Sequence, residues 1–588
     1  MVDAGGIRFP RKQWLVAPQP DDRSLAASFG VHPVLVRILA GRGITNASQA
    51  ILFLRGELAG RTDPFQMRGM ALAVDHAVRA LAAHEPIVVY GDYDADGVTA
   101  TALLVRFLTL LGADVRAYIP SRFEEGYGLN PGAIRQLAAE GARLIITVDC
   151  GVRSFVEAGL CRELGIDLVI TDHHQPLGEV PDAAAVVNPK QPGDDSAEKN
   201  LAGVGLAYKL AQAIGERVGD SAPSASFLED AVELVAVGTV ADLAPLTGEN
   251  RTLVRRGLSR MNSGGPHNPG LRALARAAKV TPGTVRGHTI GFVIGPRLNA
   301  AGRLETARAA LDLLLTDDSH VALDLAHQLD SWNRRRQEET RITFEHARDE
   351  VLGLRAPLPA DAGPYFLLAA HESYSSGIIG LAASRLTEEY YRPSAVVALE
   401  GEEARGSARS IPAFHVTRAL DACGDLLIRH GGHAAAAGFT IARANLPELA
   451  RRLELLAHAD LGHAPLEPTL PVDAEVRLEE LAGLNDALPG LEPCGMGNPT
   501  PVFVARGLTI REKRRVGSDG SHLKLRVEQD GRRMNAIAFR WGEAAEALPA
   551  RVDAAFQLTV NEYMGERRDE LHIVDLAPTK NARAAAPA

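Results

Sequence analysis

The chain has 588 residues, of which 46% are apolar and 23% are charged, and its formal net charge is −10. This length exceeds one hydrophobic core, so we expect about three or four domains of ordinary globular composition. Widely spaced cysteines and the lack of a long apolar run argue against a disulfide framework, a structural zinc site, a signal peptide and a membrane span, and favour a cytoplasmic location.

Residues 1–60 predict a small helical or irregular lead-in. From Ile87 to about residue 315, short apolar runs alternate with amphipathic stretches, as in "PIVVYGD", "RLIITVDC" and "DLVITDHH". Strands of about five residues between helical segments make βαβ units and a parallel sheet. We therefore expect a first α/β domain over residues 61–318.

Residues 319–354 contain no glycine or proline before Gly353 and carry apolar residues at helical spacing, which predicts one long helix. Beyond a turn-rich break, residues 365–462 predict a second, smaller α/β domain. Residues 468–579 carry alternating patterns with Gly and Asp turns, which favour a small all-β barrel or sandwich. Residues 580–588 predict a disordered tail. The expected fold class is therefore multidomain α/β followed by an all-β barrel.

Potential metal ligands follow four apolar runs of the first α/β domain, where we expect strands to end. They are Asp92, Asp94 and Asp96 in "GDYDADG", Asp149 in "VDCG", Asp172, His173 and His174 in "TDHH", and Asp242 in "GTVADL". Parallel sheets hold ligands at the carboxyl ends of their strands, so we expect these side chains to converge. Crowded carboxylates repel unless a cation neutralises them. Carboxylates with imidazole but no thiolate favour Mn²⁺ or Mg²⁺, and the ligands suffice for two ions.

Each motif also has a purely structural interpretation. "DYDADG" is compatible with a solvated turn, or with a calcium-like loop that lacks its distal glutamate. Asp149 and Asp242 are compatible with helix caps, and the histidine pair with ordinary surface side chains. The functional hypothesis depends on the conjunction, because chance rarely places such ligands after four separate strands.

In this order the motifs resemble those of the DHH phosphoesterase superfamily, named after the triplet Asp172-His173-His174. The similarity continues in "PRLNAAGRLE", "HESYSSGIIGLAASRL", "GSARS" and "HGGHAAAAGF", which resemble the accessory DHHA1 domain. "LEPCGMGNPTPVF" begins a segment similar to the oligonucleotide-binding (OB) domain of the family's bacterial single-strand-specific exonucleases. The resemblance covers about residues 40–580. It implies a metal-dependent 5′→3′ exonuclease of single-stranded DNA that acts in DNA repair and recombination.

The resemblance also implies roles for the acidic cluster. The two ions are assigned to Asp94 and Asp149, and to Asp96, Asp149, His173 and Asp242, with Asp149 bridging. His174 then lies beside the scissile phosphate, and Asp172 supports a ring N–H group. Some relatives have a histidine where this chain has Tyr90. We therefore expect the Asp94 site to be the weaker one, with water or Asp92 compensating.

Substrate-binding residues are expected in several segments. They are Asn299, Arg303, His371, Ser375, Ser407, Arg409, Gly432 and His433, which offer donors for phosphates, and Arg514 and Arg515 in the barrel. The glycines of "HGGHAAAAGF" let backbone N–H groups approach a phosphate, although the pattern alone is typical of a tight turn. The barrel segment is basic around a predicted hairpin, with Phe539 and Trp541 nearby. This suits single-strand binding by charge and stacking, or a solvated hairpin face.

We expect metal-assisted hydrolysis of a phosphodiester by in-line attack of water, without a covalent protein nucleophile. A passage between the α/β domains that admits only single strands would explain strand selectivity. The expected partners are single-stranded DNA, a helicase and a single-strand-binding protein, and the chain is expected to be a monomer. Two alternatives stay open. One is a phosphodiesterase of short oligonucleotides or cyclic dinucleotides, whose relatives lack the barrel. The other is a non-catalytic DNA-binding scaffold, whose relatives lose the ligands that this chain retains.

Overall fold

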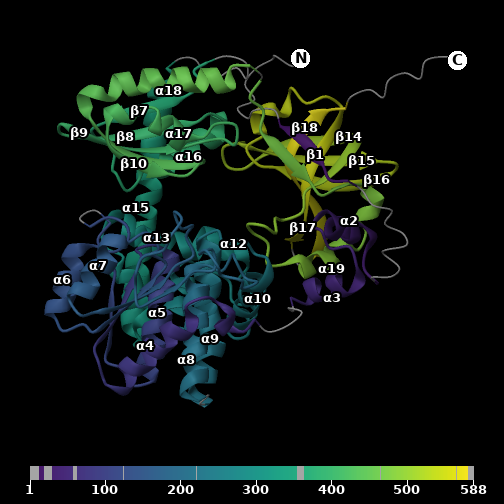
Figure 1. Cartoon of the computed structure of the whole chain (residues 1–588). Helices are drawn as coiled ribbons and strands as arrows, with labels where there is room; N and C mark the ends of the chain where they lie inside the picture. The colour runs from purple at the N-terminus through teal and green to yellow at the C-terminus, as the bar shows by residue number, and fades with distance from the viewer. Residues whose placement is uncertain are drawn as a thin grey trace. The chain divides into compact units, whose positions relative to one another are not determined.

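The computed structural model of the chain describes residues 12–18, 30–56, 62–122, 125–219, 222–353, 363–463, 465–563 and 566–579 (Figure 1). These residues divide into two compact units. The first comprises Leu52–Arg336 and Gly490–Pro499, and the second comprises the described residues within 1–51, 337–489 and 500–588. Among the helices of the described ranges, none is long and apolar enough to cross a membrane. The domain limits expected from the sequence stay predictions.

The first unit contains a five-stranded parallel sheet in the order β3-β2-β4-β5-β6. Its strands are β2 (Ile87–Gly91), β3 (Val115–Tyr118), β4 (Leu144–Val148), β5 (Asp167–Thr171) and β6 (Ala185–Val187). Its helices are η1 (Pro64–Gln66), α4 (Met70–Ala82), α5 (Ala95–Leu110), α6 (Pro131–Ala139), α7 (Phe155–Glu163), α8 (Gly203–Val218), α9 (Ala222–Ala241), α10 (Gly248–Asn262), α11 (Pro269–Ala277), α12 (Gly287–Thr289), η2 (Ile290–Ile294), α13 (Gly295–Leu304) and α14 (Arg308–Leu315).

Both faces of this sheet are covered by helices, which explains the uninterrupted apolar runs of its strands. Side chains alternate between the two faces of a strand. Accordingly, Ile87 and Val89 pack in one core with α4, α5, α8 and α9, whereas Val88 and Tyr90 pack in another with α6 and α7. The first α/β fold expected from the sequence is confirmed.

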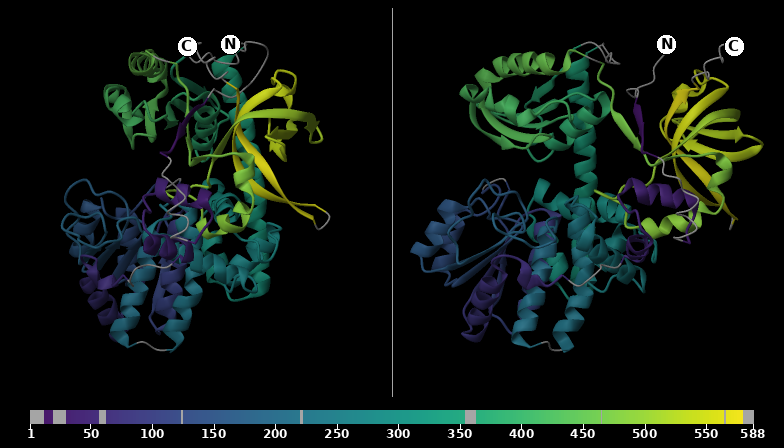
Figure 2. Two further views of the ribbon diagram at one scale, coloured as in Figure 1. Left: turned by 90° about the vertical axis from the view of Figure 1, so that its right-hand side faces the viewer. Right: turned by 45° about the vertical axis from the view of Figure 1, so that its right-hand side comes forward.

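Helix α15 (Ser319–Leu352) extends over 34 residues and is visible along most of its length in Figure 2. Asp318 caps its start, because the carboxylate accepts hydrogen bonds from the N–H groups of His320 (2.7 Å) and Val321 (3.3 Å). Its residues up to 336 belong to the first unit, where Ala322, Ala326 and Leu329 lie in the core at helical spacing. Its later residues pack in a core of the second unit.

The second unit contains a mixed sheet in the order β10-β11-β9-β8-β7, in which only the β7–β8 pair is parallel. The elements of this part are β7 (Leu367–His371), α16 (Ile379–Tyr390), β8 (Ser394–Glu400), β9 (Glu403–Arg409), α17 (Val416–Asp421), η3 (Gly424–Leu426), β10 (Leu427–Gly432), β11 (Ala436–Ala442), η4 (Arg443–Asn445) and α18 (Leu446–Leu461). The smaller α/β fold expected from the sequence is confirmed.

The same unit contains a closed five-stranded barrel in the order β14-β15-β16-β18-β17, which closes through the β14–β17 pairing (Figure 2). Its elements are β13 (Ala474–Glu475), β14 (Phe503–Val516), β15 (His522–Gln529), β16 (Arg532–Ala538), η7 (Gly542–Ala545), β17 (Arg551–Tyr563) and β18 (Glu566–Pro578). Alternate side chains of β15, namely Leu523, Leu525 and Val527, are buried inside the barrel. The expected all-β barrel is confirmed.

Short elements precede the barrel. They are α2 (Pro33–Gly41), α3 (Ala47–Arg55), η5 (Leu478–Leu481), α19 (Leu484–Ala487) and η6 (Leu488–Leu491). The lead-in also contributes a strand that the sequence did not predict: β1 (Gln13–Val16) pairs in parallel with β12 (Thr469–Val472). Trp14 of β1 donates its indole N–H to Asp575 Oδ2 at 2.7 Å.

Candidate active site

Three neighbouring strands of the first unit end in potential ligands at one edge of the sheet. Asp92 follows β2, Asp149 follows β4 and Asp172 follows β5, and these strands lie side by side in that order. Because the strands are parallel, their carboxyl ends meet at the same edge. The convergence expected from the sequence is present for these three aspartates.

One expectation about this edge is wrong. The apolar run before Asp242 is not a strand but the end of α9, whose residues 231–240 are all buried. A short apolar run cannot distinguish a buried helix from a buried strand. Asp94 and Asp96 lie at the start of α5. Asp94 caps α5 by accepting from the N–H groups of Asp96 (2.8 Å) and Gly97 (3.1 Å), so Asp96 lies in the first helical turn.

Asp96 is fully buried and is oriented by the start of α8. Its carboxylate accepts hydrogen bonds from the backbone N–H groups of Gly203 (2.7 Å) and Val204 (2.8 Å). A Cβ atom on Gly203 would lie only 2.6 Å from Asp149 Cβ, so the close approach of α8 requires glycine. The sequence analysis missed Gly203, although the small residues of "LAGVGLA" at a helix start were a visible signal.

The ring of His173 points toward three carboxylates. Its Nε2 lies 3.0 Å from Asp149 Oδ1, 3.8 Å from Asp242 Oδ2 and 3.9 Å from Asp96 Oδ2. The groups whose ligand atoms lie within 4.8 Å of one another are Asp96, His173 and Asp242; Asp92, Asp94 and Asp149; and Asp149, His173 and His174. The first two groups lie where the two metal sites are expected, although the first lacks Asp149 and the second adds Asp92 to Asp94 and Asp149. The assignment of these residues as metal ligands stays a prediction.

The chemistry of this donor set fits divalent cations. Asp92 Oδ1, Asp149 Oδ1 and His173 Nε2 are buried without a hydrogen-bond partner among the described residues. Burial, reinforced by neighbouring aspartates, raises the pKa of Asp149 well above its ordinary value and that of Asp242 to about 9. Burial and the charge of Asp94 raise the pKa of the Asp96 carboxyl to about 7. Burial lowers the pKa of His173 to about 3, which leaves its ring neutral and able to ligate. A bound cation would relieve the repulsion and satisfy these atoms.

Asp149 has φ 63°, a left-handed conformation that is uncommon for a residue other than glycine. Asp149 is 2% exposed, and at this residue the backbone leaves the sheet directly after β4. Backbone strain of this kind is found where the surroundings hold a functional side chain in place. Here it places one carboxylate in two of the three ligand groups.

Tyr90 does not contribute to this site. It is completely buried on the opposite face of the sheet, where its hydroxyl donates to the carbonyl of Gly128 at 3.1 Å. Its ring stacks on Tyr118 with centroids 4.9 Å apart. On the Asp94 side, the residues that could hold an ion are Asp92, Asp94 and Asp149. That this is the weaker site stays a prediction.

Asp172 orients His174 rather than His173. Its Oδ1 accepts from His174 N (3.0 Å) and lies 2.8 Å from His174 Nδ1, and its Oδ2 accepts from Val152 N (2.9 Å). Burial opposes the charged pair, but these bonds lower the pKa of Asp172 and raise the pKa of His174. Two residues missed by the sequence analysis hold the same loop. The Tyr127 hydroxyl lies 3.2 Å from His174 Nδ1, and Asn188 Nδ2 donates to the carbonyl of His174 at 2.8 Å.

Asn299 and Arg303 both lie on α13 of the same unit. Asn299 Oδ1 accepts from the backbone N–H of Ala95 at 2.7 Å, so its carbonyl oxygen helps to start α5. Asn299 therefore lies next to Asp94 and Asp96, with its amide nitrogen as the remaining donor. Its expected contact with substrate stays a prediction.

A further segment shapes the loop that follows Asp242. Residues 490–499 belong to the first unit, although the residues on both sides belong to the second. Arg251 of α10 is 4% exposed and donates to the carbonyls of Leu491 (2.8 Å) and Pro493 (3.2 Å). The carbonyl of Met496 accepts from Leu246 N at 2.7 Å. From the sequence this segment was expected at the start of the barrel, and its contact with the loop that follows Asp242 was not predicted.

In the second unit, Ser407 and Arg409 of β9 lie together. Arg409 Nη1 donates to Ser407 Oγ at 3.0 Å. A Cβ atom on Gly380, near the start of α16, would lie 3.0 Å from both Ser407 Oγ and Arg409 Nη2, so this glycine leaves room beside the two donors. His371 ends β7, where Nδ1 lies 2.8 Å from Ser373 Oγ, and the carbonyl of Ser375 accepts from Ile379 N at 3.1 Å.

Gly432 and His433 lie at the turn from β10 to β11. Gly432 has φ 153°, and a Cβ atom there would lie 2.3 Å from the carbonyl oxygen of Ala436. His433 is exposed, and its backbone N–H donates to Ala436 O at 2.8 Å. Ala436, at the end of this turn, lies opposite Arg409 of β9, and the N–H of Ser410 donates to the carbonyl of Ala435 at 2.9 Å. The turn therefore lies beside the end of the strand that carries Ser407 and Arg409.

The basic hairpin expected in the barrel is formed by β14 and β15, in which Arg514 lies opposite Lys524. Arg514 and Arg515 are exposed, and neither forms an ion pair with a residue in the described part of the chain. In contrast, Glu528 binds Arg511 (2.7 Å) and Arg533 (2.6 Å). Only part of the basic cluster is therefore available to a polyanion.

One of the two aromatic residues expected near the hairpin is accessible. Phe539 is 51% exposed, with its ring edge-on to His522 and His572 at centroid distances of 5.2 Å and 5.5 Å. Trp541 is 9% exposed and belongs to the interior. Stacking on a base is therefore open to Phe539 but not to Trp541.

Comparison with known families divides the chain in the same order. Residues 86–239 match the DHH family, N-terminal domain; residues 363–459 match the DHHA1 domain; and residues 472–575 match the RecJ OB domain. The chain is 36% identical to the single-stranded-DNA-specific exonuclease RecJ of Bacillus subtilis, over 96% of this chain and 71% of that protein. It is 34% identical to the RecJ of Escherichia coli, over 93% of this chain and 96% of that protein.

Solved structures agree with these similarities. RecJ from Thermus thermophilus in complex with Mn²⁺ has a TM-score of 0.83 and 33% identity, and the match covers 97% of this chain and 80% of that chain. The same protein in complex with Mg²⁺ has a TM-score of 0.77 and 31% identity, over 97% of this chain and 79% of that chain.

Proposed function

The chain belongs to the RecJ family of single-stranded-DNA-specific exonucleases, and on that premise we propose that it removes nucleotides from the 5′ end of single-stranded DNA during repair and recombination. It is accordingly a hydrolase of single-stranded DNA that uses divalent cations, Mn²⁺ or Mg²⁺. The observation that carries the reaction is the convergence of the ligand groups around Asp149 and His173. The carboxylate and imidazole mixture favours Mn²⁺ as the preferred ion.

We assign one ion to Asp94 and Asp149, with Asp92 in support. We assign the other ion to the group around His173, which consists of Asp96, Asp149, His173 and Asp242. When bound, two such ions supply the positive charge that activates water and stabilises the phosphoryl group. The chain contributes the rigid frame: the α5 cap, the α8 N–H groups and the strained backbone of Asp149 hold the carboxylates in place.

His174 acts on the substrate in this proposal. Because Nδ1 is engaged by Asp172, Nε2 is the nitrogen left for a phosphate oxygen. The raised pKa of His174 favours the protonated ring, which donates a charge-assisted hydrogen bond to a developing negative charge. Asp172 is a positioning residue, since its contacts are to His174 and to the backbone.

Binding of the strand is assigned to donors outside the acidic cluster. They are Asn299, Arg303, His371, Ser375, Ser407, Arg409, Gly432 and His433, and on the barrel Arg514 and Arg515. The paired donors Ser407 and Arg409 beside Gly380 support a phosphate contact, and the exposed Arg514 and Arg515 support sequence-independent binding. The proposal also includes action as a monomer, a cytoplasmic location, and cooperation with a helicase and a single-strand-binding protein.

The test is digestion of long single strands that carry an exonuclease-resistant end at either the 5′ or the 3′ side, with Mn²⁺ and Mg²⁺ compared. We expect 5′ protection to block release of nucleotides, 3′ protection to leave it unchanged, and duplexes to resist. Digestion that stops only at 3′-protected ends would contradict the proposed polarity. A length series separates the alternative of a short-oligonucleotide phosphodiesterase, because that enzyme would digest short strands only.

A further inference from the structure

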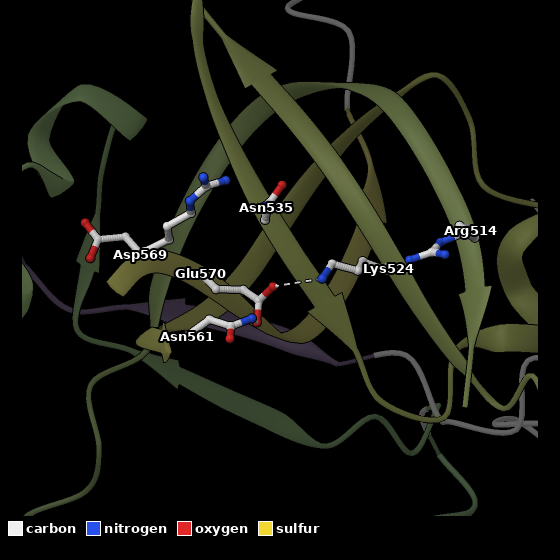
Figure 3. A pocket seen from close by; sticks show the side chains of 7 residues that line it. Arg514, Lys524, Asn535, Asn561, Asp569 and Glu570 are labelled. Carbon is white, nitrogen blue, oxygen red and sulfur yellow. Dashed lines mark hydrogen bonds and ion pairs between the residues drawn. The ribbon is translucent and has the colours of Figure 1, made fainter. Parts of the chain in front are cut away.

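The outer face of the barrel carries a polar pocket of about 410 Å³, a size typical of small-molecule sites (Figure 3). Its lining comes from β14, β15, β16, β17 and β18. Lys524 lies between the buried Leu523 and Leu525 of β15, so its side chain points outward. Asn535 of β16 lies opposite Glu570 of β18, which brings these two side chains to the same patch.

Glu570 is the centre of the pocket. It is only 6% exposed, and its Oε2 accepts from Asn561 Nδ2 at 3.0 Å. Lys524 Nζ lies 3.8 Å from Glu570 Oε1, within ion-pair range but too far for a hydrogen bond (Figure 3). Glu570 Oε1 has no hydrogen-bond partner among the described residues. A buried carboxylate oxygen without a donor is unfavourable, so the pocket calls for a ligand that brings N–H groups.

The rest of the lining adds cations and amides. Three basic residues, Arg514, Lys524 and Arg568, line the same pocket as Glu570, and Asn535 lies opposite Glu570 on the neighbouring strand. The second carboxylate, that of Asp569, already accepts from Asn485 Nδ2 at 2.6 Å. The ligand should therefore combine donors for Glu570 with acceptors and negative charge for the surrounding cations. A nucleotide meets these requirements, whereas a cationic peptide would be repelled by the three basic side chains.

Among nucleobases, guanine offers the matching edge. Its N1–H and N2–H₂ groups are adjacent donors that fit a carboxylate, and its O6 and N7 atoms are acceptors for lysine, arginine or an amide. Adenine, cytosine and thymine each place an acceptor beside any donor on that edge. We propose that this pocket is a guanine-selective nucleotide site, in which Glu570 reads the base and Lys524 and Asn535 contact its acceptor atoms.

This inference rests on the proposed function only in taking the base from single-stranded DNA. It adds a base preference to a barrel whose other basic residues bind the backbone without regard to sequence. A strand that presents guanine would be held more tightly by the barrel than one that does not.

The test measures equilibrium binding to the full chain carrying Asp149→Ala, so that strands are not digested. The probes are oligothymidylate strands in which spaced positions carry dG, deoxyinosine, dA or dC. We expect dG strands to bind about fivefold or more tightly than dA or dC strands, the low end for a bidentate base contact. Deoxyinosine, which lacks the 2-amino group, should fall between them.

The variants are chosen to separate recognition from charge and folding. Glu570→Gln and Asn535→Ala should abolish the preference while leaving oligothymidylate binding and the melting temperature close to those of the parent. Glu512→Gln makes the same change of charge on the exposed side of β14, where Glu512 binds Arg526 at 3.1 Å, and should retain the preference. Free dGMP distinguishes the source of the base: if it removes the preference, the pocket also accepts free nucleotides, and if it does not, the strand alone delivers the guanine.

Equal affinity for all strands, or a preference that survives Glu570→Gln, would overturn the inference. Displacement of the dG strand by a lysine-rich peptide but not by dGMP would overturn it in favour of a protein partner. The two proposals fail separately. If the parent chain digests oligothymidylate normally without preferring guanine strands in binding, only the pocket assignment is lost. If it neither binds nor digests oligothymidylate, the proposed function is lost.

Discussion

At the scale of single residues, Asp149 combines burial, a left-handed backbone and membership of two of the three ligand groups. Aspartates more often cap helices or lie in exposed turns than adopt a left-handed backbone conformation while buried. A Cβ atom on Gly203 would lie 2.6 Å from Asp149 Cβ, so the close approach of α8 to Asp149 requires glycine. The residue is therefore held for its carboxylate, and its removal should affect chemistry more than folding.

Replacing Asp149 with alanine is expected to reduce hydrolysis of single-stranded DNA by more than about a hundredfold, because both ions lose a ligand. Strand affinity, measured by fluorescence anisotropy, should stay close to that of the parent. Asp167→Ala is the matched control, since Asp167 starts β5 at the opposite edge of the same sheet and binds Arg79 at the surface. Near-normal turnover by Asp149→Ala would exclude the metal assignment.

The adjacent histidines are expected to fail in different ways. His173→Ala should raise the Mn²⁺ concentration needed for half-maximal activity, because Nε2 of His173 faces the carboxylates. His174→Ala should lower turnover by about a hundredfold or more at saturating Mn²⁺, since it removes a donor to the phosphate. Mn²⁺ binding followed by electron paramagnetic resonance checks the division: weakened binding in His174→Ala but not in His173→Ala would reverse the two roles.

Metal binding should become more favourable as the pH rises. The pKa values of Asp96 and Asp242, about 7 and about 9, are raised above the ordinary value near 3.8, so both groups hold protons that a cation must displace. A carboxyl whose pKa is raised in the folded state stabilises the metal-free fold at pH values below its ordinary pKa. This stabilisation is lost as the pH rises through the raised pKa of the folded state. The increase in melting temperature on adding Mn²⁺ should therefore grow from pH 6 to pH 9. An increase that is constant or shrinks over this range would contradict the assignment.

At the scale of elements, the segment 490–499 is joined to α10 and to the loop after Asp242. The buried guanidinium of Arg251 satisfies several backbone carbonyls at once, including that of Gly490 at 3.1 Å. Carbonyls deprived of such a donor inside the protein would be left unpaired. This contact orders the backbone that follows Asp242, a proposed metal ligand.

Arg251→Ala is expected to lower the stability of the first unit by roughly 2–4 kcal/mol, because charged hydrogen bonds to buried carbonyls are lost. Calorimetry of the metal-free chain measures this loss of stability. A Mn²⁺ titration should also show that a higher Mn²⁺ concentration is needed for half-maximal activity, because the loop that follows Asp242 is less well ordered. Arg256→Ala is the control in the same helix, where Arg256 binds Glu229 at the surface at 2.7 Å. If both variants changed the Mn²⁺ concentration for half-maximal activity equally, the proposed effect of Arg251 on Asp242 would be excluded.

At the scale of the whole molecule, the net charge of −10 conceals a barrel with locally exposed arginines. Ion pairs with glutamate neutralise Arg511 and Arg533, whereas Arg514 and Arg515 stay open to a strand. In the proposed function, the acidic cluster performs the chemistry and the barrel supplies affinity for longer strands. The salt dependence of strand binding should therefore depend on the barrel and not on the acidic cluster.

Arg514→Gln with Arg515→Gln should weaken binding of long strands and reduce the slope of log K against log salt by about 1.4, the value for two phosphate contacts on a single strand. Cleavage of short strands should change little. The matched pair Arg511→Gln with Arg533→Gln should change the slope less, because both side chains already bind Glu528. An unchanged slope in the first pair would exclude these arginines from the binding path.

The sequence by itself determined the chemistry and the order of the parts. Apolar runs followed by ligands predicted the parallel sheet and its acidic edge, because side-chain type and spacing are local properties. Tertiary structure alone decided which side chains meet. The run before Asp242 proved to be a buried helix, Asp94 a helix cap, and Asp172 the partner of His174. Gly203, Arg251 and Glu570 contact residues that are distant in the chain, namely Asp96, Leu491 and Lys524. No local pattern marks such partners, because burial and contact are fixed only when the whole chain packs.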